Sequence, residues 1–245
     1  SQSLMAVTTG ANNTGVGGNA LTANTTADYN TAIGMDALKS VTTGAQNTMV
    51  GALSGDAITT GQYNVGMGIH AVGSTTTASY NTGLGYNALF ANTTADHNTA
   101  VGYAALDANT TGGTNTAIGS SALTANTTAS FNTAVGHSAL EANTTGADNT
   151  AVGKNSLVAN TTGQYNVALG SSALLTNTTA NSNTAVGFFS LKLNTTGTAN
   201  VAVGTDALQK NTTASNNTAV GHSALVENTT GAQNNAFGKG TLDAN

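Results

Sequence analysis

Apolar and polar residues follow one fixed period along this chain. A pattern of Asn, Thr or Val, a small residue, an aliphatic residue and Gly starts again every 17 residues, as in residues 132–136. Its Asn falls at 13, 30, 47, 64, 81, 98, 115, 132, 149, 166, 183, 200, 217 and 234, with no insertion or deletion between copies. Such a period predicts a solenoid, in which each repeat forms one coil of a continuous stack.

Coil positions are numbered here from this Asn as position 1, and residues at one position form a column. Position 5 is always Gly, position 4 is always apolar, and position 9 is Leu in nearly every coil. Positions 13 and 14 are Thr-Thr, whereas positions 6, 7, 10, 16 and 17 accept many residue types. The constant columns therefore mark the places where the coil tolerates few side chains.

Positions 1 to 5 predict a short strand, because residue types alternate along them. We expect the aliphatic residue at position 4 and the Leu at position 9 to point inward. The core residues predicted in this way include Val101, Leu106, Val135, Leu140, Val152, Leu157, Val186 and Leu191. We expect Thr at position 2 to point inward as well, with its hydroxyl bonded to the backbone.

The small residues at position 3 would then form a smooth strip on the outer face of the sheet. A smooth face invites close contact with another surface. We therefore predict a self-association strip made of Ala100, Ala117, Ala134, Ala151, Ala168, Ala185, Ala202 and Ala219.

Positions 6 to 12 leave two alternatives open, one helical turn or a second strand. Segments such as residues 137–143 contain good helix formers. Lys210 and Glu227 at position 11 favour the turn, because in a second strand they would share the inward face with position 9. We expect Gly at position 5 to take a positive φ at a corner, and the Asn-Thr-Thr segment to form another turn.

Together these columns predict a mainly β protein. It is a parallel β-solenoid, or β-roll, of about fourteen 17-residue coils, forming a single repeat domain over residues 1–245 with stacked Asn ladders. Ser1 and Asn245 both fall inside a coil without a capping sequence, which predicts a segment of a longer fibre.

Two coils, residues 47–63 and 64–80, depart from the pattern. Gly55 and Val72 replace the Leu of position 9, and Ile58 and Thr75 replace the Asn of position 12. We interpret these coils as a local weak spot or a lateral contact.

Composition limits the partners. Ten acidic residues against five lysines give a net charge of -5, with no basic stripe that could follow a phosphate backbone, so nucleic acid is not an expected partner. The chain has no cysteine, and its longest apolar runs are far shorter than the ~20 residues of a membrane span. We expect neither membrane insertion nor a cofactor.

With these columns set out, residues 144–153 (Thr-Thr-Gly-Ala-Asp-Asn-Thr-Ala-Val-Gly) resemble the head repeats of trimeric autotransporter adhesins. They are still more similar to the repeat arrays of bacterial and phage tail-fibre-like proteins. The resemblance extends over essentially the whole chain, and it implies an extracellular or virion fibre of parallel β-coils, with three chains side by side.

Groups that could carry catalysis do not converge in the predicted stack. His137 and His222 share position 6 but lie five coils apart, or about 24 Å at ~4.8 Å per coil. Asp107 and Glu141 share position 10 at about 10 Å, on a convex wall without a cleft. The sequence contains no phosphate-binding loop, nucleophile elbow or zinc-protease motif, so we expect neither a catalytic nor a metal site.

The most suggestive binding feature is aromatic. Tyr63, Tyr80 and His97 occupy position 17 of three successive coils, and Tyr86 and Tyr103 form a shorter pair at position 6. The first three rings are the candidate ligand site, because a ladder of rings can stack against sugars; the simpler alternative is that the rings stack on one another.

Ten Asn-Thr-Thr triplets match the acceptor motif for N-glycosylation, although a repeated turn explains them as well. Their asparagines are Asn24, Asn92, Asn109, Asn126, Asn143, Asn160, Asn177, Asn194, Asn211 and Asn228.

These features favour a structural fibre or adhesin shaft at a cell or virion surface that assembles with itself, as a lateral trimer or an end-to-end filament. Its other expected partner is a cell-surface glycan, and we expect no enzyme activity. An ice-binding solenoid is the alternative, although Thr-Thr neighbours in an extended strand would point to opposite faces. A carbohydrate-binding or carbohydrate-processing tail-fibre segment is a further alternative. Processing would require a group of acids that the sequence does not show.

Overall fold

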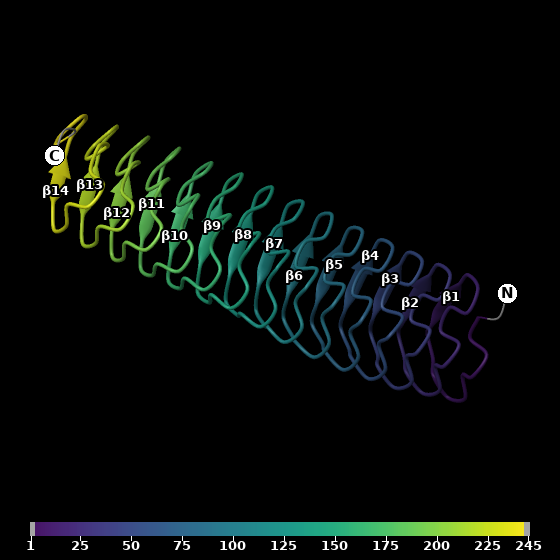
Figure 1. Cartoon of the computed structure of the whole chain (residues 1–245). Helices are drawn as coiled ribbons and strands as arrows, with labels where there is room; N and C mark the ends of the chain where they lie inside the picture. Colours follow the sequence, from purple (N-terminus) through teal and green to yellow (C-terminus); the bar gives the residue numbers. More distant parts are fainter. Residues whose placement is uncertain (1–2, 243–245) are drawn as a thin grey trace. The chain divides into compact units, whose positions relative to one another are not determined.

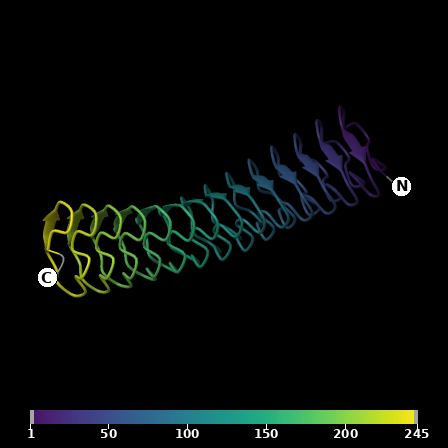
Figure 2. The same ribbon diagram turned by 90° about the horizontal axis from the view of Figure 1, so that it is seen from above.

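The computed structural model describes residues 3–242, so the coil positions of Ser1 and Asn245 lie outside the described residues. The chain divides into two compact units, Ser1–Ser120 (unit 1) and Ser121–Asn245 (unit 2). The expectation of a single repeat domain over residues 1–245 stays a prediction. In each unit, one short strand per coil lies beside the next, and loops complete the coil (Figures 1 and 2).

The fold is the predicted parallel β-solenoid, and each described strand has three residues, at coil positions 2 to 4. The strands of unit 1 are β1 (Thr14–Val16), β2 (Thr31–Ile33), β3 (Thr48–Val50), β4 (Val65–Met67), β5 (Thr82–Leu84), β6 (Thr99–Val101) and β7 (Thr116–Ile118). The strands of unit 2 are β8 (Thr133–Val135), β9 (Thr150–Val152), β10 (Val167–Leu169), β11 (Thr184–Val186), β12 (Val201–Val203), β13 (Thr218–Val220) and β14 (Asn235–Phe237).

Within each unit the strands pair in parallel and in sequence order, with a register of one whole repeat. Val135 pairs with Val152 and Ala134 with Ala151, so identical coil positions lie on consecutive rungs. Among residues 3–242, no helix has the length and apolar character needed to cross a membrane.

The segment at positions 6 to 12 is neither of the two predicted structures. It is a series of turns, in which the residues at positions 7 and 9 adopt positive φ, as Ser138 (φ 55°) and Leu140 (φ 52°) do. A left-handed residue ends both a helical turn and an extended strand, and two of them close together fold the chain back on itself.

The invariant Gly at position 5 has the predicted positive φ and a second reason to be constant. Gly136 has a φ of 135°, and a Cβ added there would lie 2.6 Å from the carbonyl oxygen of Gly153 in the next coil. A side chain at this corner would therefore push two coils apart.

The strand faces are reversed relative to the prediction. The position-3 alanines point into the coil, and none has an exposed fraction above 2%. The interior there is narrow: a Cβ added to Gly83 at position 3 would lie 2.8 Å from Val72 and 2.9 Å from the Ala88 carbonyl oxygen. Small residues occupy this column because little space remains inside the coil.

The predicted core residues divide in the same way. Leu106, Leu140, Leu157 and Leu191 at position 9 are fully buried, as expected. Val101, Val135, Val152 and Val186 at position 4 are only partly buried, because they lie on the outer face of the sheet. Thr at position 2 also lies on this face, and no side-chain hydrogen bond within residues 3–242 involves its hydroxyl, contrary to the expected backbone partner.

Two Asn ladders hold the coils together, as predicted. At position 1, Asn149 donates from Nδ2 to the Gly163 carbonyl at 2.8 Å and accepts the Asn166 backbone N–H at 3.0 Å. At position 12, Asn160 donates to Asn143 Oδ1 at 2.8 Å and to the Gly163 carbonyl at 3.0 Å. The buried amides thus have partners in their own coil and in the neighbouring coils.

An apolar cluster extends from the coils that precede the two irregular coils into both of them. Met49 is fully buried at position 3, and a Cβ added to Gly55 would lie 2.9 Å from its Sδ. Val41 and Ile58 are fully buried where other coils have Asn, and Val72 packs in the same cluster. A large residue at position 3 therefore accompanies a Gly at position 9, in place of the usual Ala and Leu.

Candidate functional site

The predicted aromatic site is a stack of three parallel rings in unit 1. The ring centroids of Tyr63 and Tyr80 are 4.9 Å apart, and those of Tyr80 and His97 are 5.0 Å apart, with interplanar angles of 7° and 6°. Consecutive rungs place these rings above one another, since each occupies position 17. The rings therefore stack on one another, and their edges and the Tyr hydroxyls remain for contact with a ligand.

A second pair of rings lies at position 6 of the same unit. Tyr86 and Tyr103 have centroids 5.6 Å apart and an interplanar angle of 9°. Both are exposed, as are Met35 and Ile69 in the same column. Binding of a ligand by Tyr63, Tyr80 and His97 stays a prediction.

The predicted self-association strip cannot be a contact surface of the folded chain, because its alanines have no exposed area. The residues that face outward from the same strands are those at positions 2 and 4. Leu169 and Met67 at position 4 have exposed fractions of 46% and 53%. We call the exposed side of positions 2 and 4 the sheet face.

The sheet face is uncharged, and its position-4 column is apolar throughout. Its exposed aliphatic and aromatic side chains at position 4 are Val16, Ile33, Met67 and Ile118 in unit 1 and Leu169 and Phe237 in unit 2. Val65, Val167 and Val201 are exposed at position 2, and Thr fills most of the remaining places. No Asp, Glu, Lys or His occurs at either position. An uncharged face of this kind is a candidate interaction surface.

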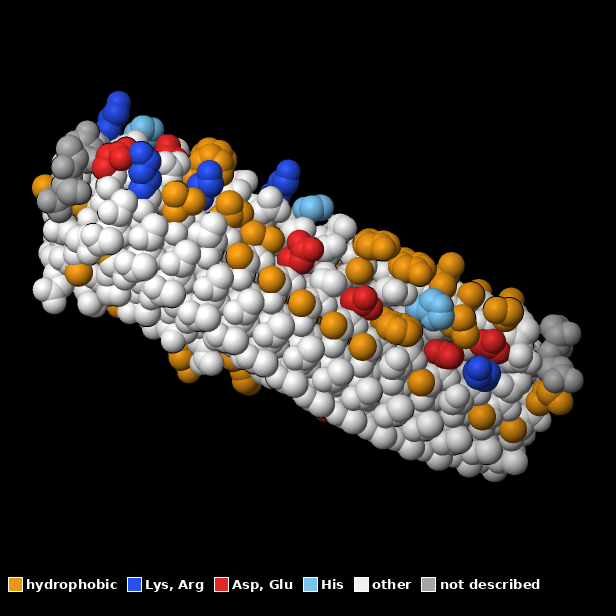
Figure 3. All heavy atoms as spheres, in the orientation of Figure 1, with side chains coloured by type: hydrophobic (Ala, Val, Ile, Leu, Met, Phe, Trp, Pro, Cys, Tyr) orange, Lys and Arg blue, Asp and Glu red, His pale blue; other side chains and the backbone are white. Residues whose placement is uncertain are grey.

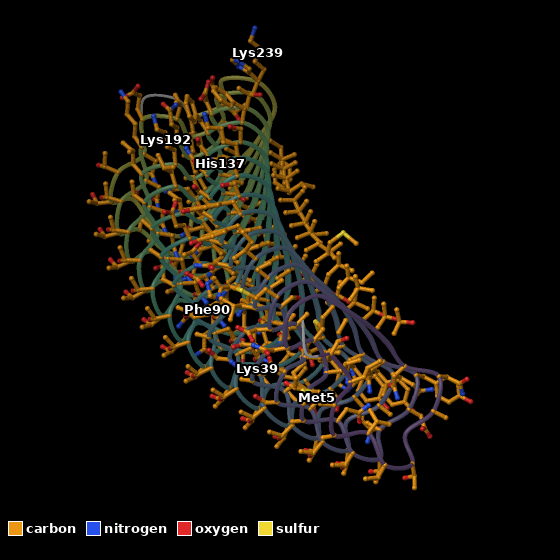
Figure 4. All side chains as sticks on the ribbon, turned by 90° about the vertical axis from the view of Figure 1, so that its right-hand side faces the viewer. Met5, Lys39, Phe90, His137, Lys192 and Lys239 are labelled. Atoms are coloured by element: carbon orange, nitrogen blue, oxygen red, sulfur yellow. The ribbon has the colours of Figure 1, made fainter. Side chains whose placement is uncertain are left out.

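Charged residues lie on other columns. Lys154 and Lys239 are at position 6 and Asp107 and Glu141 at position 10. In Figure 3, the charged side chains of unit 2 lie mostly along the upper edge of the face shown, whereas those of unit 1 lie in a band below that edge. Lys239 projects away from the ribbon in Figure 4. The sheet face thus stays free of charge because acids and lysines occupy the turns.

The ionisable groups do not assemble into a reactive centre within the described residues. The one ion pair there joins Lys210 Nζ to Glu227 Oε2 at 2.7 Å, one coil apart. His222 Nδ1 lies 3.0 Å from the hydroxyl of its neighbour Ser223. Residues 3–242 form neither a detectable pocket nor a group of three metal-ligating side chains.

Two carboxyl groups in unit 1 have perturbed acidities. Burial raises the pKa of the Asp107 carboxyl above its ordinary value, and Asp107 Oδ1 is buried without a hydrogen-bond partner. Burial also raises the pKa of Asp56, while the nearby Lys39 opposes this effect. Asp107 and Glu141 belong to different units, so their predicted separation stays a prediction.

One surface cluster was missed by the sequence reasoning. Phe188 and Phe189 lie with ring centroids 3.7 Å apart, and Lys192 Nζ lies 4.0 Å from the Phe189 ring centroid. The adjacent aromatic residues at positions 6 and 7, followed by Lys at position 10, were the available signal. This cluster and the sheet face are the exposed features that the prediction did not identify.

Comparison with known proteins does not assign the chain to a family. No family model, no curated protein and no solved structure matches the chain. The geometry of the coils and of the sheet face therefore carries the functional argument.

Proposed function

We propose that this chain is a structural element of a fibre or adhesin shaft at a cell or virion surface, working by self-assembly and without catalysis of its own. The coils support this proposal because almost every inward polar group has a partner in the same or the next coil. Each further coil adds length to such a stack and one more stabilising interface between neighbours. The ionisable residues, by contrast, are spread over separate columns.

The observation that carries the proposal is the uncharged sheet face with its exposed apolar column at position 4. Leu169, Met67 and Ile33 expose large side chains there, at one coil spacing from neighbours of the same kind. A second copy of the chain has the same spacing, so two sheet faces can pack rung against rung. Closed lateral packing gives a trimer or another closed oligomer, whereas head-to-tail contact propagates as a filament.

The test is the assembly state of the purified chain. Sedimentation velocity over a range of concentrations, with electron microscopy of the same samples, should show oligomers or filaments that grow with concentration. A chain that sediments as a monomer at every concentration, and that images as single short particles, would refute the proposal.

Ice binding is a second candidate, because the sheet face combines Thr hydroxyls at position 2 with aliphatic groups at position 4. The Thr-Thr columns are less suited to ice binding, because the hydroxyl of the first Thr in most pairs is already hydrogen-bonded to the next coil. Thr161 Oγ1, for example, donates to the Thr178 carbonyl at 3.1 Å. Thermal hysteresis and ice-crystal shaping are the measurements. Loss of both in a Thr150→Lys variant that stays folded would locate the activity on the sheet face.

A cell-surface glycan is the proposed partner of the aromatic stack. The exposed edges and hydroxyls of Tyr63 and Tyr80 support contact from the side of the stack. A glycan array probed with the chain and with a Tyr63→Ala, Tyr80→Ala variant tests this contact. Equal binding by both would remove these rings from the site.

A further inference from the structure

The ten Asn-Thr-Thr triplets present their second threonine and hide their asparagine. All ten asparagines occupy position 12, and none has an exposed fraction above 1%. The second threonine of these triplets, at position 14, is exposed, as Thr145 and Thr162 are. The acceptor atom of N-glycosylation is the asparagine Nδ2, so exposure of the threonine does not make the triplet accessible.

The side-chain hydrogen bonds of the position-12 asparagines oppose glycosylation more strongly than their burial does. Asn160 Nδ2 uses both of its N–H groups, one to Asn143 Oδ1 and one to the Gly163 carbonyl. Asn160 Oδ1 in turn accepts from Asn177 Nδ2 at 2.9 Å. A sugar on Nδ2 would remove one donor and insert its ring between stacked coils. For the nine asparagines from Asn92 to Asn228, glycosylation and formation of the ladder are therefore mutually exclusive. Asn24 lies between Val7 and Val41 in this column, so its burial alone protects it.

The chain also contains two acceptor triplets of another kind. Asn12-Asn13-Thr14 and Asn216-Asn217-Thr218 place their first asparagine at position 17, where the backbone has a positive φ and the side chain is exposed. Asn216 has a φ of 61° and its backbone N–H donates to the Thr198 carbonyl at 3.0 Å. Its amide side chain makes no hydrogen bond within residues 3–242. Position 17 thus leaves the acceptor nitrogen free at the surface.

We propose that Asn12 and Asn216 are the N-glycan acceptor sites of the folded chain, and that the ten Asn-Thr-Thr triplets are not. In the reaction, Asn216 Nδ2 forms a bond to the anomeric carbon of a lipid-diphosphate oligosaccharide. The bond from that carbon to the diphosphate oxygen breaks, the lipid diphosphate leaves with the electron pair, and Nδ2 releases one proton. A glycan at position 17 projects from the coil edge and leaves both Asn ladders intact.

The test uses the full-length folded chain with a purified single-subunit oligosaccharyltransferase and a lipid-diphosphate oligosaccharide donor. Peptide mass spectrometry should find glycan at Asn12 and Asn216 and none at the Asn-Thr-Thr asparagines. The same chain, digested before the reaction, should be modified at both kinds of triplet, which shows that the enzyme accepts each sequence.

Two variants sharpen the comparison. Ser182→Asn creates a third triplet of the exposed kind, because Asn183 and Thr184 follow it, and should add one glycan. Thr218→Val removes the hydroxyl of the Asn216 triplet, and Val201 in the same column shows that the coil accepts Val there. This variant should lose the glycan at Asn216 and retain the melting temperature.

Two results would overturn the proposal. One is glycan at any Asn-Thr-Thr asparagine of a chain that circular dichroism shows to be folded. The other is the absence of glycan from Asn216, or from residue 182 of the Ser182→Asn variant, when the digested chain is modified there.

Discussion

Leucine at position 9 combines burial with a left-handed backbone. Leu140 has a φ of 52° and no exposed area, and the same holds for Leu106 and Leu157. A left-handed conformation costs a residue with a Cβ about 1–2 kcal/mol. Full burial of a Leu side chain contributes about 1.5–3 kcal/mol. Burial therefore offsets the backbone cost, and this explains why Leu, rather than Gly, occupies a left-handed position.

Replacement of this leucine by an acid should unfold the coil locally. Leu140→Asp places a carboxylate among apolar side chains with no partner, at a cost of several kcal/mol, on the order of 3–5. Glu141→Ala, one residue further, changes a partly exposed side chain and should leave the melting temperature within a few degrees. Thermal melting followed by circular dichroism compares the two variants. Equal melting temperatures would show that position 9 does not face the interior.

Burial of Asp107 should make stability depend on pH in a defined direction. Its pKa is raised above the ordinary value of 3.8, so the unfolded chain loses this proton at lower pH than the folded chain. The contribution of Asp107 to the stability of the fold is therefore greatest below about pH 3.8. It is lost as the pH rises through the raised pKa of the folded chain.

Asp107→Asn removes this loss of stability at neutral pH, because an amide does not ionise. The variant should melt at a higher temperature than the unmodified chain at pH 7, and the difference should shrink at pH 3. Glu141→Ala, at the same coil position, serves as the control. A difference between Asp107→Asn and the unmodified chain that grows toward pH 3 would contradict this account.

The strand shows how far sequence alone determines the element. The 17-residue period, the parallel register, the Gly corner and the two Asn ladders were all predictable, because each depends on residue types that repeat in place. The inward face was not, because alternation separates two faces without saying which one is inside. The narrow interior beside Gly83 settled that choice in favour of the small residue.

The conformation of the loop at positions 6 to 12 could not be predicted from the sequence, for a different reason. Its left-handed residues are Leu, Ser, Asn, Asp and others, and only Gly signals positive φ clearly. The aromatic stack was predictable, since one column on consecutive rungs brings rings together. The sheet face was not, because it required the inward face to be known.

In the irregular coil of residues 47–63, the large side chain lies at position 3 and the small residue at position 9, and this reversal can be tested. Gly55→Leu should clash with Met49, since even a Cβ would lie 2.9 Å from the Met49 Sδ, at a cost of about 1–3 kcal/mol. Met49→Ala alone leaves a cavity and should cost about 2–5 kcal/mol. The backbone does not oppose a leucine at this place, because Gly55 has a φ of 59° and Leu89 in the same column has 58°.

The double variant restores the Ala and Leu pair of the regular coils. It should be more stable than the sum of the two single changes predicts, with a coupling of about 0.5–3 kcal/mol. Denaturant unfolding of the four proteins measures this coupling. Additive effects would show that Met49 and Gly55 do not share one space.

At the scale of the whole molecule, each coil contacts its neighbours within its own unit, and the same two strand faces recur in both units. The interior column at position 3 and the exterior column at position 4 are adjacent in sequence, yet they have opposite roles. Substitution at one should affect folding, and substitution at the other should affect assembly. This contrast separates the sheet face from the alanine strip as the surface between copies.

The corresponding experiment places lysine on each column of unit 2. Leu169→Lys combined with Val152→Lys adds two charges to the exposed sheet face, which should leave the melting temperature nearly unchanged and abolish oligomers or filaments in sedimentation. Ala168→Lys puts an ammonium group into the narrow interior and should cost several kcal/mol, on the order of 3–5, so the coil unfolds. Thr162→Lys, on the exposed position-14 column, is the control for added charge and should both fold and assemble. If Ala168→Lys stays folded and stops assembly, while the sheet-face variant assembles like the unmodified chain, the copies meet through the alanine column instead.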